Sequence, residues 1–430
     1  MIKLSALSLA FAASFSHAST VTVDCGKLLD VKAGVWRDRV SVVIEDGTIK
    51  SIIPMNTGNS ATNHVDLSAF SCLPGLIDMH VHLTSETKRQ GDAASDALRL
   101  NPADYAYSSV VFAERTLKAG FTTVRDLGSA DGLNISLKRA IANGAILGPR
   151  MFTAGKSIAT TGGHADPTNG LSQKLRDAIG TPGPVEGVIS GADGARDAVR
   201  ARYKDGSDLI KITATGGVLS QATSGQNAQF TDEELRAIVA TAKDYGFRVA
   251  AHAHGLEGIK RALRNGIDSI EHGTYMDDEA IALFKKTGAW YVPTIAAGKF
   301  VAEKSALPDY YSPVVRPKAA AIGPLIQATF VKAYKAGVKI AFGTDAGVFP
   351  HGENAKEFVY MVEAGMPALE AIRSATLSAA QLLDQSNRLG SIEAGYAGDI
   401  VAVSGDPLKN IALLQQIEFV MKEGVVITKP

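Results

Sequence analysis

The segment LPGLIDMHVHL, residues 73–83, is typical of an apolar strand that ends in two histidines. Pro74 and Gly75 mark the turn before the strand. Because alternate residues of a strand point to the same side, His80 and His82 face one position in space. An isolated His-x-His pair serves structural roles as readily as it binds a metal, so its meaning depends on the strands that follow.

Short apolar segments recur along the chain, separated by segments with helical periodicity. The predicted strands are residues 76–83, 122–127, 150–157, 209–215, 248–254, 269–273, 291–295 and 340–345. The predicted helices include residues 192–204, 231–245, 256–265, 277–286 and 318–336. The helix at 231–245 opens with a capping signal at Thr231 and Glu234. Eight strands alternating with helices predict an α/β protein with a (β/α)8 TIM barrel. The alternative is a doubly wound sheet, which is disfavoured because no glycine-rich phosphate fingerprint follows the first strand.

The two ends of the chain have a different pattern. Residues 20–74 hold β-branched runs and turns without a helix, and residues 396–429 are similar. Neither end is long enough for a sheet with a core of its own. We therefore predict a small β-sandwich domain built from residues 19–74 and 386–430, with the barrel spanning residues 75–385.

The first 18 residues have the features of a secretory signal peptide. Lys3 precedes an apolar run over residues 4–15, and Ser16-His17-Ala18 is a small-x-small cleavage site. Removal of this leader implies export, to a periplasm or to the exterior, where a disulfide can persist. The remaining chain holds two cysteines, Cys25 and Cys72, which form one bridge or stay as buried thiols.

Composition narrows the class of protein. The chain has 430 residues, 46% apolar and 20% charged, with 44 basic and 44 acidic side chains. These fractions argue against a disordered chain, and no apolar stretch reaches the roughly 18 residues that a membrane span needs. The balanced charge gives no electrostatic signature of nucleic-acid binding. An enzyme or a binding protein remains.

One lysine interrupts an apolar strand. Lys211 lies within DLIKIT, residues 208–213, and burial of an unpaired ammonium group is costly. Either its side chain extends to solvent from an exposed edge, or its neutral amine has added carbon dioxide to form a carbamate that bridges two cations. His252, His272 and Asp345 end three further strands. The predicted barrel would thus collect these groups at the C-terminal ends of its strands, where barrel enzymes have their active sites.

This constellation resembles the amidohydrolase superfamily over essentially the whole mature chain. Residues 73–83 look like its opening motif, and GYAGDIV at 395–401 looks like its return into the β domain. The chain is most similar to the imidazolonepropionase-like branch, which contains Xaa-Pro and Xaa-Lys/Arg-type dipeptidases (carboxypeptidase-type prolidases) and ochratoxinase. The segments that carry this similarity are TGGH at 161–164, TGG at 215–217, AHAHG at 251–255 and IEHG at 270–273.

The resemblance implies a binuclear centre of two Zn²⁺ or other divalent ions. The implied ligands are His80, His82, Lys211, His252, His272 and Asp345. The first histidine pair would hold one ion and the later two histidines the other, with N6-carboxylated Lys211 as the bridge. Asp345 would contact the first ion and a bridging hydroxide, and would act as general base. Nitrogen and oxygen ligands suit zinc, and two ions lower the pKa of a shared water.

Two further histidines are candidates for substrate contacts. His164 follows two glycines at the end of the third strand, and it would bond the tetrahedral oxyanion or a substrate carboxylate. His254 lies two residues beyond His252, so a strand would aim both the same way. The family pattern makes His252 the ligand, which leaves His254 as a neighbour or substrate contact. The alternative for His164 is an ordinary loop histidine, and the alternative for His254 is a loop histidine or one that supports a ligand.

The predicted function is hydrolysis of the amide bond of dipeptides or N-acyl amino acids with a free carboxylate, ochratoxin-type amides included. The alternatives are hydrolysis of a cyclic amide, lactone or phosphotriester, and a non-enzymatic exported protein that binds a metal or small ligand. The predicted partner is a small-molecule or dipeptide substrate, with no nucleic acid and no membrane span. Relatives suggest a homo-oligomer such as an octamer. Loops at residues 84–101, 296–312 and 347–354 are expected to shape the pocket.

Overall fold

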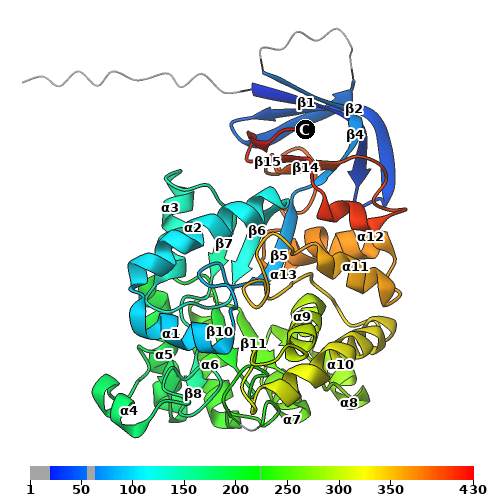
Figure 1. The fold of residues 1–430 in the computed structure, drawn as a ribbon. Helices are drawn as coiled ribbons and strands as arrows, with labels where there is room; N and C mark the ends of the chain where they lie inside the picture. Colours follow the sequence, from blue (N-terminus) through cyan, green and yellow to red (C-terminus); the bar gives the residue numbers. More distant parts are fainter. Residues whose placement is uncertain (1–19, 56–62, 223) are drawn as a thin grey trace, which may run out of the picture.

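The computed structural model describes residues 20–55, 63–222 and 224–430 and has mixed α/β architecture (Figure 1). The predicted signal peptide, residues 1–18, lies outside the described residues. Among the described residues, no helix combines the length and the apolar character needed to cross a membrane.

Strands from both chain ends pair in one seven-stranded sheet, with the order β16-β15-β14-β4-β1-β2-β3. Its strands are β1 (Thr20–Asp30), β2 (Val35–Glu45), β3 (Thr48–Pro54), β4 (His64–Pro74), β14 (Ile400–Val403), β15 (Phe419–Lys422) and β16 (Val425–Thr428). The ends join where β14 runs antiparallel to β4. Figure 1 shows these blue and red strands together at one end of the molecule. Pairing between the two ends agrees with the sequence pattern; a separate β-sandwich domain stays a prediction.

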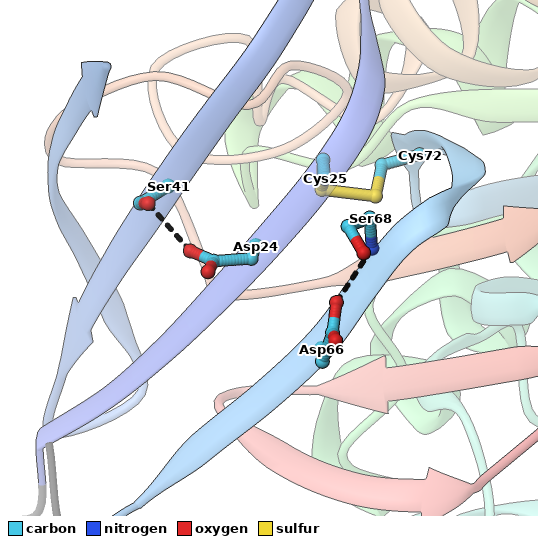
Figure 2. The surroundings of a disulfide bond; sticks show 6 residues. All are labelled: Asp24, Cys25, Ser41, Asp66, Ser68 and Cys72. Atoms are coloured by element: carbon cyan, nitrogen blue, oxygen red, sulfur yellow. Dashed lines mark hydrogen bonds between the residues drawn. A yellow bond between two sulfur atoms is a disulfide. The ribbon is translucent and has the colours of Figure 1, made fainter. Parts of the chain in front are cut away.

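A disulfide between Cys25 and Cys72 connects β1 with β4 (Figure 2). Both cysteines are fully buried in an apolar cluster that also contains Leu28, Phe419 and Met421. Of the two alternatives for these cysteines, the bridge is the one present.

The middle of the chain supplies parallel strands. One sheet contains β5 (Leu76–Val81), β6 (Phe121–Asp126) and β7 (Arg150–Thr153), and another contains β10 (Ile210–Thr213), β11 (Val249–Ala253), β12 (Ser269–His272) and β13 (Trp290–Val292). A third, two-stranded sheet consists of β8 (Ala159–Thr160) and β9 (Val188–Ile189). Seven of the predicted strands therefore overlap strands of the structure.

The eighth predicted strand, residues 340–345, is not a regular strand. Ile340 makes one parallel bridge to β13, and Ala346 makes another to β5. Between them, Asp345 has a positive φ of 61°, which ends the extended conformation. The segment still lies between β13 and β5, because the amide of Met79 donates to Phe342 O and the amide of Asp345 donates to His80 O. A further parallel bridge pairs Ile158, which follows β7 in the chain, with Ile212 on β10.

Helices follow most of the parallel strands and surround them (Figure 1). They are α1 (Gln90–Arg99), α2 (Pro102–Lys118), α3 (Leu133–Ala142), α4 (Gln173–Ile179), α5 (Gly191–Asp205), α6 (Asp232–Asp244), α7 (Leu256–Arg264), α8 (Asp278–Thr287), α9 (Ile295–Ser305), α10 (Arg316–Lys335), α11 (Lys356–Glu363), α12 (Ala368–Arg373) and α13 (Ala379–Leu382), with a π-helical turn η1 (Ser374–Ser378) and a 3₁₀ helix η2 (Ile411–Gln415). The predicted capping box of α6 is present, since the amide of Glu234 donates to Thr231 Oγ1 and the amide of Thr231 donates to Glu234 Oε2.

We expect loss of the disulfide to lower stability without changing the site. The bridge spans 47 positions of sequence, so replacing Cys25 and Cys72 by alanine should lower the free energy of unfolding by about 2–4 kcal/mol. Denaturant unfolding measures this change, and the parent protein with reductant is the matched comparison. Two free thiols in the denatured parent without reductant would contradict the bridge.

Candidate metal centre and active site

All eight sequence-predicted site residues line one cavity of about 240 Å³. They are His80, His82, His164, Lys211, His252, His254, His272 and Asp345. The cavity lies where β5, β10, β11 and β12 end, because the C-terminal ends of parallel strands meet at one edge. The structure therefore brings together residues that are up to 265 positions apart in the sequence.

The first group of candidate metal ligands consists of His80, His82 and Asp345. Asp345 Oδ1 lies 3.3 Å from Nε2 of each imidazole. Burial opposes ionisation of Asp345, but His80 and His82 outweigh it and lower the pKa of this carboxyl to about 2. Burial also disfavours the charged form of His82, yet the hydrogen bond and charge of Asp345 raise the pKa of that histidine. The group thus attracts positive charge, as a cation site requires.

Hydrogen bonds outside the cavity orient both imidazoles. His80 Nδ1 lies 3.0 Å from Glu271 Oε2, and His82 Nδ1 lies 2.9 Å from Gly128 O. Because an ionised carboxylate and a carbonyl oxygen only accept hydrogen bonds, each Nδ1 carries the proton. In the neutral form of each histidine, Nε2 therefore presents a lone pair to the cavity, as a histidine ligand needs.

The second group consists of His252, His254 and His272. His252 Nε2 donates to Gly216 O at 3.1 Å, which leaves its Nδ1 as the nitrogen with a free lone pair. His254 Nδ1 lies 2.8 Å from Thr274 Oγ1, and His272 Nδ1 lies 2.7 Å from Thr294 Oγ1. Burial lowers the pKa of His254 to about 3 and those of the other two well below the ordinary value, so all three are neutral at neutral pH.

Lys211 lines the same cavity as both groups and is buried rather than at an exposed edge. Its Nζ is 3.4 Å from His80 Nε2, and among the described residues no carboxylate oxygen lies within 4.0 Å of it. Burial lowers the pKa of this amine to about 8. A neutral fraction of the amine therefore exists near neutral pH, which the addition of carbon dioxide requires.

Glu271 and Arg125 support the first group from inside the fold, and sequence reasoning missed both. Arg125 Nη2 donates to Glu271 Oε1 at 2.8 Å, and Arg125 Nε donates to Met79 O at 2.6 Å. Burial opposes ionisation of Glu271, but Arg125 and His80 lower its pKa to about 2. The position of Glu271 immediately before His272 was its only signal in the sequence.

Asp78 connects the two segments that carry the first group, and it too was missed. Its Oδ1 accepts from the amides of His80 and Thr344, and its Oδ2 accepts from Thr344 Oγ1 and Asn354 Nδ2. These bonds hold β5 against the irregular segment that ends in Asp345. Burial raises the pKa of Asp78 to about 6, although the four hydrogen bonds oppose the rise.

His164 closes one side of the cavity. Its amide donates to Gln229 Oε1 at 2.8 Å, its Nδ1 pairs with Ser220 Oγ, and its ring centroid lies 4.5 Å from that of His252. A Cβ atom on Gly217 would lie 2.2 Å from the ring, so only glycine fits there. Burial lowers the pKa of His164 to about 4, which makes it a neutral hydrogen-bonding group.

Much of the remaining wall of the cavity is apolar, although Ser157, Thr213 and Thr294 also line it. Part of the apolar surface comes from α9, where the sequence pattern predicts a loop at residues 296–312. The apolar residues of the wall are Val218, Leu219, Ala297, Val301, Ile322, Ile326 and Val348. This apolar surface can exclude water from a bound substrate.

Residues 72–428 match the model of the Amidohydrolase family, and the chain belongs to this family. It is 32% identical to ochratoxinase from Aspergillus niger over 376 residues, which cover 83% of this chain and 76% of that protein. Its fold is that of the amidohydrolases, and the protein is a hydrolase enzyme that acts on amides.

Two solved structures extend the comparison. The chain has 51% identity and a TM-score of 0.91 to a Xaa-Pro dipeptidase with bound methionine in its active site, covering 95% of this chain and 99% of that one. It has 31% identity and a TM-score of 0.85 to a prolidase complexed with N-methylphosphonate-L-proline, covering 96% and 100%.

We expect Glu271→Gln to weaken metal binding, because a neutral amide accepts more weakly from His80 Nδ1. The affinity for zinc should fall about 10–100-fold, measured by competition with a chelator. Stability should also fall by about 3–5 kcal/mol, since Arg125 loses its counter-charge. Glu234→Gln is the matched control, because Glu234 is also buried but caps α6. Equal zinc affinities of the two variants would contradict the role of Glu271.

Proposed function

We propose that the protein is a binuclear metal-dependent hydrolase of dipeptides or N-acyl amino acids with a free C-terminal carboxylate. One observation carries the proposal: two groups of candidate metal ligands share a single cavity with the buried Lys211. A protein that only binds a metal has no need of this lysine. The family membership supports amide hydrolysis as the reaction class.

The donor atoms fit two divalent ions. His80, His82 and Asp345 would hold the first ion, and His252 and His272 the second, with Lys211 as N6-carboxylysine between them. Neutral imidazoles with oriented rings and a carboxylate are ligands that zinc prefers. The bound ions would supply Lewis acidity toward the scissile carbonyl and would lower the pKa of a water.

Asp345 is the proposed general base. Its carboxylate is ionised at neutral pH and faces the cavity between two histidines. It would take a proton from the attacking water and pass it to the nitrogen of the departing amine. A carboxylic acid with a pKa near 2 gives up this proton readily to an amine.

His164 and His254 are the proposed substrate contacts. Both are neutral imidazoles in the cavity wall, and each has one ring nitrogen already paired with a hydroxyl. The second nitrogen can bond the oxyanion of the tetrahedral intermediate or the carboxylate of the substrate. The relatives that are named dipeptidase, prolidase and ochratoxinase support an amide with an amino acid as leaving group.

The proposed architecture is a (β/α)8 barrel of residues 75–385 with a β-sandwich domain from both chain ends. Parallel bridges between successive central segments, including those of Ile158, Ile340 and Ala346, support the barrel. The Cys25–Cys72 disulfide supports the proposal that residues 1–18 direct export to a periplasm or to the exterior. The homo-oligomer stays a prediction.

A substrate screen tests the reaction. The zinc-loaded enzyme should release amine from members of a dipeptide library or an N-acyl amino acid library, and the released amine is the readout. Activity on a lactam or a lactone, combined with none on either library, would contradict the proposed reaction and favour a cyclic substrate.

Lys211→Ala tests the bridge. We expect kcat/KM to fall at least about a hundredfold, because the stabilisation supplied by the second ion is worth several kcal/mol. Lys260→Ala is the matched control, since Lys260 is buried on α7 and pairs with Asp277 outside the cavity. Bicarbonate should also increase the activity that metal-free parent enzyme regains with zinc. Full turnover by Lys211→Ala would overturn the carbamate bridge.

A further inference from the structure

A second cavity, of about 400 Å³, adjoins the cavity of the candidate metal centre. Leu219 lines both cavities, and Thr84, two residues after His82, lies in the wall of the second one. The second cavity is larger than the first, which measures about 240 Å³. A substrate that reaches the metal centre can therefore extend past Leu219 into a separate space.

Three aromatic side chains line the second cavity, beside polar and charged ones. Tyr105 and Phe112 come from α2, and Tyr311 comes from the segment between α9 and α10. Leu100 and Val315 add aliphatic surface. Aromatic rings and aliphatic groups of this kind bind a flat apolar group by stacking and burial.

One polar atom in these walls lacks a partner. The hydroxyl of Tyr311 is buried, and among the described residues it has no hydrogen-bond partner. The whole Tyr311 side chain is buried as well, since the residue is only 7% exposed. A buried hydroxyl without a partner is costly, and an acceptor on a bound ligand would remove that cost.

The charges of the second cavity oppose an anionic ligand. Glu86 and Asp96 line it, and among its described lining residues the one cation, Lys88, already pairs with Asp96 at 2.7 Å. Glu86 accepts from the amide of His351 at 2.9 Å and faces Arg115 at 3.7 Å. The free carboxylate of the leaving amino acid is therefore disfavoured here, whereas the acyl side of the substrate carries no such charge.

We infer that the second cavity binds the acyl side of the amide substrate and selects bulky aromatic acyl groups that carry a hydrogen-bond acceptor for Tyr311. The inference rests on the proposed function, because it presupposes that an amide is cleaved in the first cavity.

Two substrates that share one leaving amino acid test this subsite. One carries an acetyl group and the other a methoxynaphthoyl group, and the leaving amino acid is the one that the parent enzyme releases best. Ala93 lies in the wall on α1 and is exposed, so Ala93→Trp fills the cavity without disturbing the core. We expect kcat/KM for the naphthoyl substrate to fall about tenfold or more, with the acetyl substrate unchanged within about twofold.

Leu98→Trp is the matched control, because Leu98 is on the same helix, is 75% exposed and does not line the cavity. Tyr311→Phe is the second variant, since it removes only the hydroxyl. It should lower kcat/KM about tenfold for the methoxynaphthoyl substrate, mainly through KM, and should leave the acetyl substrate and a plain naphthoyl substrate unchanged.

The possible outcomes test the proposed subsite and the proposed reaction separately. A parent enzyme that cleaves both substrates, with Ala93→Trp affecting both equally or neither, overturns the subsite and leaves the proposed function intact. An unchanged methoxynaphthoyl reaction in Tyr311→Phe overturns the role of the hydroxyl. A parent enzyme that cleaves no amide contradicts the proposed function, and the subsite falls with it.

Discussion

The buried carboxylate of Glu271 is the interaction on which the candidate centre depends. It accepts from Arg125 on β6, pairs with Nδ1 of His80 on β5, and lies on β12 itself. Three strands are thus joined by one anion, whose burial is tolerable because Arg125 supplies the opposite charge. This anion also sets the tautomer of His80, since a carboxylate accepts only from a protonated nitrogen. Ring orientation in the cavity is therefore a consequence of charge pairing inside the sheet.

The apolar surroundings of the cavity also set the protonation states of the other candidate ligands. Burial lowers the pKa values of His252, His254 and His272, so their imidazoles stay neutral, and it lowers that of Lys211 to about 8. Neutral imidazoles are metal ligands, and a neutral amine can add carbon dioxide. Asp345 stays ionised because the neighbouring histidines outweigh its burial. Removal from water thus favours the neutral forms of the imidazoles and of Lys211, whereas the ionised form of Asp345 depends on the charges of its neighbours.

Much of the fold and the site could be predicted because the signals are local. The periodicity of two places His80 and His82 on one side of a strand, and the apolar strand around Lys211 made burial one of the two alternatives for that lysine. The regular strand expected at residues 340–345 was wrong, because the positive φ of Asp345 is not encoded in apolar periodicity. Asp78, Arg125 and Glu271 escaped notice because an ordinary charged residue becomes informative only when its partner is known.

The sequence by itself determined the candidate metal ligands and placed several of them on strands of the central sheets, since both follow from residue type and short-range periodicity. It also determined which two cysteines were available to pair. Only the tertiary structure decided which ring nitrogen faces the cavity, because Glu271 and His80 lie 191 positions apart and meet only once the strands are ordered. It likewise decided that Leu219 lies between two cavities, because loops from distant segments meet there and their packing depends on the whole fold.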